Sequence, residues 1–156
     1  VCPMDCSGHG NCSKGKCVCE GSFGDVDCSV DLRNPPIVYG IPERGVCDLQ
    51  RNGCKNVSVL GDNFVASDKL SCRLTLFKIQ LNGTILKDAL TIIVDGKKIS
   101  FAEVSCSIQD VRSKRSVQFN DDLDTVAIVY GVAISNNKKN FSQDSILLLY
   151  DCLCLD

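Results

Sequence analysis

The chain has 156 residues, which is enough for one ordinary domain and a very small second one. Its 17 Lys and Arg nearly balance 19 Asp and Glu, and this balance argues against the concentrated basic face that nucleic-acid recognition requires. The longest apolar stretch, residues 126–134, is too short to cross a bilayer, so we expect no membrane insertion within this segment.

The N-terminal 28 residues hold half of the twelve cysteines, spaced C-x3-C-x5-C-x4-C-x-C-x8-C. A segment this short buries too little apolar surface to fold alone, so crosslinks must replace the missing core. Such dense crosslinks persist outside the reducing cytosol. The pattern therefore predicts an extracellular protein, either secreted, in the matrix or in a cell-surface ectodomain. The cysteines concerned are Cys2, Cys6, Cys12, Cys17, Cys19 and Cys28.

The segment CPMDCSGHGNCSKGKCVCEGSFGDVDC resembles an EGF-like module of the tenascin type. This resemblance implies the disulfides Cys2–Cys12, Cys6–Cys17 and Cys19–Cys28. A zinc site with His9 is the alternative, but cysteines already paired in disulfides do not ligate metal. Calcium-binding modules of this family carry acidic and amide residues before the first cysteine, where this chain has only Val1. We therefore expect no metal and no cofactor.

Residues 29–36, SVDLRNPP, lack apolar periodicity and end in two prolines, which indicates a short stiff linker. Short strand patterns follow, and no helical periodicity does. Two dipeptides, Asn82-Gly83 and Asp95-Gly96, predict hairpins with type I′ turns. Many short strands separated by turns are typical of an antiparallel sandwich. The predicted strands are residues 37–41, 55–60, 71–81, 84–90, 91–94, 98–101, 103–108, 125–135 and 145–150.

The landmarks PPIVYGIPERG, VSVLGDNF, LSCRL, AEVSCSI and VAISNNKKNFSQDSILLLYD occur in the order found in IPT/TIG domains, which are immunoglobulin-like sandwiches. The resemblance implies a Cys72–Cys106 crosslink and a core position for Phe64. The expected fold is thus mainly β: an EGF-like module at 1–30, a linker at 31–36, and an antiparallel immunoglobulin-like β-sandwich at 37–156.

Four cysteines remain outside these two patterns. Cys47 and Cys54 bracket a short loop, and a local bond between them is the simplest assignment. Cys152 and Cys154 have three open possibilities: each other, the first pair, or a following module. This combination also resembles large secreted mosaics that join von Willebrand D domains to EGF repeats.

Two kinds of modification motif occur. The Asn-x-Ser/Thr sequons at Asn11, Asn56, Asn82 and Asn140 are candidate glycosylation sites and agree with a secretory route. The run Arg112, Ser113, Lys114, Arg115, followed by Ser116, matches the pattern that furin-like convertases recognise. Its alternative reading is a solvated basic loop, and accessibility of the loop decides between them.

Enzymatic chemistry has little support. His9, the only histidine, lies within the cysteine-rich segment, so the rest of the chain has no Ser-His-Asp or Cys-His set. We predict a non-enzymatic structural and adhesive segment of a multidomain extracellular protein, acting through contacts with protein partners that the sequence does not identify. The alternative is a ligand-binding receptor ectodomain matured by cleavage after Arg115.

Overall fold

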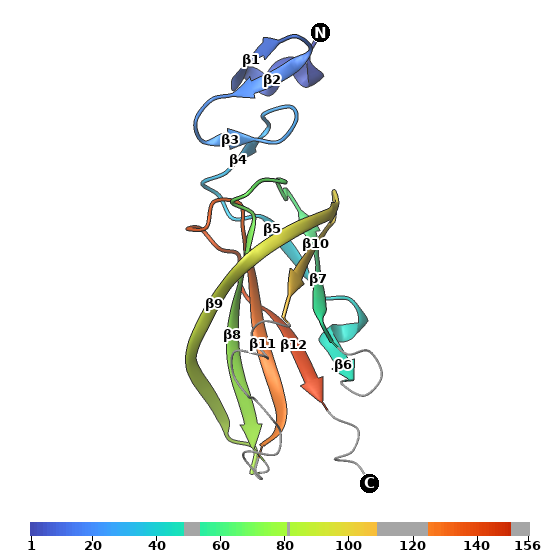
Figure 1. The fold of residues 1–156 in the computed structure, drawn as a ribbon, viewed down its shortest axis with the longest axis vertical. Helices are drawn as coiled ribbons and strands as arrows, with labels where there is room; N and C mark the ends of the chain where they lie inside the picture. The colour runs from blue at the N-terminus through green and yellow to red at the C-terminus, as the bar shows by residue number, and fades with distance from the viewer. Residues whose placement is uncertain (49–53, 81, 109–124, 151–156) are drawn as a thin grey trace.

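The computed structural model describes residues 1–48, 54–80, 82–108 and 125–150. Two separate clusters of buried side chains occur in it, a small one near the N-terminus and a large one in the remainder. Figure 1 shows the N-terminal hairpins above a long curled sheet. The mainly-β prediction is confirmed, because strands account for most of the regular structure.

The N-terminal part is built from short elements: η1 (Pro3–Gly8), β1 (Gly10–Ser13), β2 (Lys16–Cys19), β3 (Phe23–Gly24) and β4 (Val30–Asp31). β1 pairs with β2, and β3 pairs with β4, both antiparallel. Lys14 and Gly15 close the first hairpin with φ of 52° and 79°. Positive φ at both central residues is the requirement of a type I′ turn, so the turn that we expected elsewhere forms here, at a Lys-Gly pair.

The η1 segment has an unusual backbone. Met4, Asp5, Cys6 and Ser7 have φ between 48° and 53°, which is the left-handed region. For residues with a Cβ this conformation costs about 1–2 kcal/mol each. Cys6 and the preceding Cys2 are both bonded to the β1–β2 hairpin. The crosslinks therefore hold η1 in a conformation that this sequence does not favour by itself.

The larger sheet has the strand order β5-β7-β10-β9-β8-β11-β12-β6. Neighbouring strands are antiparallel, except that β12 and β6 run parallel. The long strand β9 borders β10 along one part and β8 along the other, so the sheet curls over along it (Figure 1). The elements are β5 (Ile37–Gly40), η2 (Glu43–Gly45), β6 (Val46–Asp48), β7 (Asn56–Asp62), β8 (Ser71–Gln80), β9 (Ile85–Ser100), β10 (Glu103–Ser107), β11 (Thr125–Ser135) and β12 (Ser145–Tyr150).

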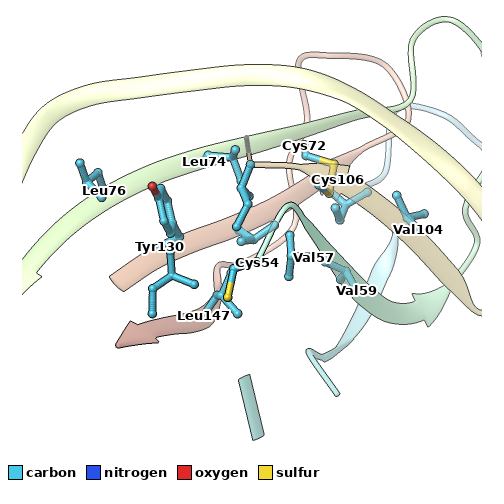
Figure 2. Close-up of a cluster of buried hydrophobic side chains, with 14 of the residues drawn as sticks. Cys54, Val57, Val59, Cys72, Leu74, Leu76, Val104, Cys106, Tyr130 and Leu147 are labelled. Carbon is cyan, nitrogen blue, oxygen red and sulfur yellow. A yellow bond between two sulfur atoms is a disulfide. The ribbon is translucent and has the colours of Figure 1, made fainter. Parts of the chain in front are cut away.

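The core lies inside this curl. Along β7 the pattern alternates, with Val57 and Val59 buried and their neighbours partly or fully exposed, as expected for a strand with one face against a core. Tyr130 of β11 is fully buried among these side chains, and Phe64, which we expected in the core, is 1% exposed. Figure 2 shows side chains from β7, β8, β10, β11 and β12 converging on one apolar interior.

One disulfide passes across the inner face of β9. Cys72 of β8 is bonded to Cys106 of β10, although β9 lies between these strands, and their Cα atoms are 6.1 Å apart. In a flat sheet, strands two positions apart are separated by about 9.6 Å. The sheet must therefore bend sharply where the bond crosses, and this bend starts the curl.

The Asp95-Gly96 turn prediction was wrong, because both residues lie within β9 and the three strands predicted between 84 and 101 form one. Gly96 is opposite Cys106, and a Cβ on it would lie 3.2 Å from Leu70 and Val104 and 3.4 Å from the Cys72 sulfur. Glycine is favoured there because the Leu70 and Val104 side chains pack tightly over that position, with the Cys72 sulfur beside them. The requirement is close packing across the bend and not a turn.

The hairpin at Asn82-Gly83 is confirmed, but its turn type was wrong. Gln80 N–H donates to the Thr84 carbonyl (3.0 Å), so these two residues form the last hydrogen-bonded pair before the loop. Gly83 N–H donates to the Gln80 carbonyl (2.9 Å), and Gly83 has φ of 84°. This is the arrangement of a three-residue hairpin loop that ends in a left-handed glycine.

Candidate interaction surfaces

Disulfides define the framework on which any surface is presented. The structure bonds Cys2 to Cys12, Cys6 to Cys17, Cys19 to Cys28, Cys47 to Cys54 and Cys72 to Cys106. The sulfurs of Cys2, Cys6 and Cys17 lie within 4.8 Å of one another, but all three are in disulfides, so none is a thiolate ligand for a metal. Cys152 and Cys154 lie outside the described residues.

Three large apolar side chains project into solvent around one end of β7. Ile37 and Tyr39 on β5 are 52% and 71% exposed, and Phe101, in the β9–β10 turn, is 81% exposed. β5 pairs with β7 on one side, at Gly61, and the Ala102 carbonyl accepts the Gly61 N–H (3.0 Å) on the other. We call Ile37, Tyr39 and Phe101 the apolar edge patch. We treat it as a candidate contact surface, because exposed apolar patches are a feature of many binding sites.

A groove of about 490 Å³ opens where the two ends of the curled sheet approach each other. Val46 and Cys47 line it from β6, and Asn56 and Val57 line it from β7. Leu147 of β12 and the buried sulfur of Cys54 lie deeper in it, and Figure 2 shows these two side by side. The lining is partly apolar and partly polar.

The junction between the N-terminal hairpins and the large sheet is packed. Leu32 follows β4, and its N–H donates to the Ser22 carbonyl (2.7 Å). A Cβ added to Gly24 would meet Leu32 at 3.0 Å and Val65 at 3.3 Å, so these groups lie in close contact. Val65 follows β7, and it is 6% exposed. The junction therefore joins the two parts through side-chain contacts as well as through the linker.

An ion pair orders the start of the predicted linker. Arg33 donates from Nε and from its terminal nitrogen to the two carboxylate oxygens of Asp31, at 2.9 and 2.8 Å. These hydrogen bonds lower the pKa of Asp31 to about 2 from an ordinary 3.8. Next to it, His9 stacks on Phe23 with ring centroids 3.8 Å apart. Asp31 belongs to β4, so regular structure extends one residue beyond the boundary expected from the sequence.

A buried asparagine that the sequence did not identify joins two loops near this junction. Asn136 is 1% exposed; its side-chain oxygen accepts the Val65 N–H (3.0 Å), and its Nδ2 donates to the Asn63 carbonyl (2.8 Å). Nothing in a Ser-Asn-Asn run distinguishes a buried asparagine that bonds two loops together, which we call the Asn136 clasp, from a solvated turn. The signal is visible only when the loop after β7 is placed beside the loop after β11.

The four sequon asparagines are all exposed, at different places. Asn11 lies on β1, Asn82 in the β8–β9 loop, and Asn140 in the loop before β12, where it accepts a hydrogen bond from Asn137 (2.8 Å). Asn56 begins β7 and is the sequon asparagine that lines the groove. The cleavage motif Arg112, Lys114, Arg115 and Ser116 lies outside the described residues.

A short segment of the chain is similar to known proteins. A segment of 32 residues is 47% identical to a protein named "Substrate-adhesion molecule" from Dictyostelium discoideum. That segment is 20% of this chain and 3% of the relative, so the chain matches only a small part of that protein. No family model and no solved structure matches the chain. Within the described residues, no helix has the length and apolar character needed to cross a membrane.

Proposed function

We propose that this chain is a non-enzymatic, adhesive segment of a multidomain extracellular protein, and that it acts through protein–protein contacts. The disulfides and the short similarity to a substrate-adhesion molecule support an extracellular adhesive role. The observation that carries the proposal is the apolar edge patch, with two aromatic side chains more than two-thirds exposed on a crosslinked scaffold. Rigid aromatic side chains are the residues on which protein interfaces most often depend.

The finer fold assignment belongs to the same proposal. We interpret residues 1–30 as an EGF-like module, 31–36 as a linker, and 37–156 as an immunoglobulin-like sandwich of the IPT/TIG type. The two separate buried clusters support the division. The sandwich is supported by the strand order, since β5, β7 and β10 lie on one side of β9 and face β8, β11 and β12 across the core.

A binding experiment tests the adhesive role. Secreted protein is immobilised, and attachment of cells and of matrix proteins is measured for wild type, Tyr39→Ser, Phe101→Ser and Ile85→Ser. Ile85 is the matched control, because it is 65% exposed but lies beside the β8–β9 loop, at the opposite end of the sheet (Figure 1). Truncating an aromatic anchor costs about 2 kcal/mol or more, which is about a thirtyfold loss of affinity.

We expect the Tyr39 and Phe101 variants to lose attachment while the Ile85 variant keeps it. Wild-type protein that supports no attachment would refute the adhesive role. Equal loss in all three variants would assign the binding to another surface.

A further inference from the structure

The curled sheet does not close into a barrel. Its order ends at β5 on one side and at β6 on the other, and β5 covers β7 only at residues 60–62. Among the described residues, the edge of β7 at Asn56–Ser58 has no ladder partner on the side away from β10. Backbone N–H and C=O groups without a ladder partner among the described residues can pair with a strand from another molecule. The groove described above lies between this β7 edge and β6.

Asn56 is placed to protect that edge. It is the first residue of β7, its side chain is exposed, and it lines the groove. Val57, the next residue, is 3% exposed and packs in the core, so strand alternation directs Asn56 away from the core. Asn56-Val57-Ser58 is also a complete glycosylation sequon. The asparagines of the other three sequons do not line this groove.

We propose that Asn56 carries an N-linked glycan whose first sugars cover the mouth of the groove and prevent a second copy of the chain from adding a strand to the β7 edge. In the modification, Asn56 Nδ2 bonds to C1 of the first N-acetylglucosamine. The bond from that carbon to the pyrophosphate of a lipid-linked oligosaccharide breaks, and Nδ2 loses one proton. Lys55, exposed beside Asn56, adds a charge that also disfavours strand pairing.

The proposal rests on the extracellular location proposed above, but it fails independently of the adhesive role because its readouts do not involve attachment. The protein is secreted from eukaryotic cells as wild type, Asn56→Gln, Ser58→Ala, Ser58→Thr and Asn82→Gln. Ser58→Ala removes the sequon without changing Asn56, and Ser58→Thr keeps the sequon at the same position. Asn82→Gln removes a sequon in a distant loop.

Glycopeptide mass spectrometry measures occupancy, and light scattering coupled to size exclusion measures self-association. We expect Asn56→Gln and Ser58→Ala to dimerise with a dissociation constant about tenfold or more below that of wild type, a change of about 1.4 kcal/mol. Ser58→Thr and Asn82→Gln should behave as wild type. Amide exchange at residues 56–58 should slow in the dimer.

A second measurement avoids dependence on variant folding. Folded wild type, folded Asn56→Asp and folded Ser58→Ala are all treated with an amidase that removes N-glycans. Because this enzyme leaves an aspartate at position 56, treated wild type should associate as equally treated Asn56→Asp does, and Ser58→Ala should not change. An unmodified Asn56 in wild type, monomeric Asn56→Gln and Ser58→Ala, or association of Ser58→Thr equal to that of Ser58→Ala would each overturn the proposal.

Discussion

Removing the Cys72–Cys106 disulfide should destabilise the large sheet more than removing the Cys47–Cys54 disulfide. The reason is the length of chain that each bond closes in the unfolded state, 34 residues for the first and 7 for the second. The loop-entropy relation then predicts about 3.8 kcal/mol for Cys72–Cys106 and about 2.4 kcal/mol for Cys47–Cys54. The difference, about 1.4 kcal/mol, depends only on the ratio of the two lengths.

Burial increases this difference. Cys72 and Cys106 are both 0% exposed, so replacing them by alanine leaves space in the core as well as a longer free chain. Cys54 is 3% exposed, but Cys47 is only partly buried. The value for the Cys72–Cys106 pair is therefore a lower bound.

Urea unfolding of the two double-alanine variants and of wild type measures this prediction. The free energy of unfolding should fall by about 3.8 and about 2.4 kcal/mol, and the denaturant slope should rise more for Cys72→Ala/Cys106→Ala, because its unfolded chain expands more. If Cys72→Ala/Cys106→Ala loses no more stability than Cys47→Ala/Cys54→Ala, the explanation from loop length is refuted.

Three further predictions concern single positions. Asn136→Ala should lower the free energy of unfolding by about 2 kcal/mol, since it leaves a buried N–H unsatisfied, and an unchanged urea midpoint would contradict the clasp. Arg33→Gln should raise the pKa of Asp31 from about 2 toward 3.8. In wild type, the stabilisation of the fold by the ion pair is full above pH 3.8 and is lost as pH falls through about 2. An NMR titration that finds the pKa of Asp31 unchanged in the variant would count against the ion pair. Gly96→Val should cost about 1–3 kcal/mol by overpacking in thermal or urea unfolding, whereas Gly21→Val, which would meet nothing within 4 Å, should cost much less; equal losses would disprove the packing argument.

Strands with one buried face were predictable from the sequence because their pattern is local. Val57 and Val59 alternate with polar residues, and β8 and β11 carry long β-branched and apolar runs. β6 was not predicted, since it has only three residues and depends on β12 for its pairing. It forms because the tertiary fold brings it beside β12, which a local pattern does not show.

Asp95-Gly96 was misread for the same physical reason. A local preference for turns competes with a disulfide between strands 34 residues apart in sequence, and the close packing around that bond decides the outcome at Gly96. The candidate contact surface could not be predicted from local sequence either. Tyr39 and Phe101 are residue types that usually lie in a core, and only the placement of β5 and of the β9–β10 turn around β7 shows that they are exposed.

The crosslink between β8 and β10 also has a mechanical consequence, which bears on the adhesive role proposed above. When the two ends of the molecule are pulled apart, the chain from Cys72 to Cys106, a separation of 34 positions in sequence, cannot straighten, because the bond carries the force past it. At about 3.5 Å per extended residue, this withholds about 120 Å of length. Under load the segment would therefore stretch less before it becomes fully extended than a chain of its size without the bond.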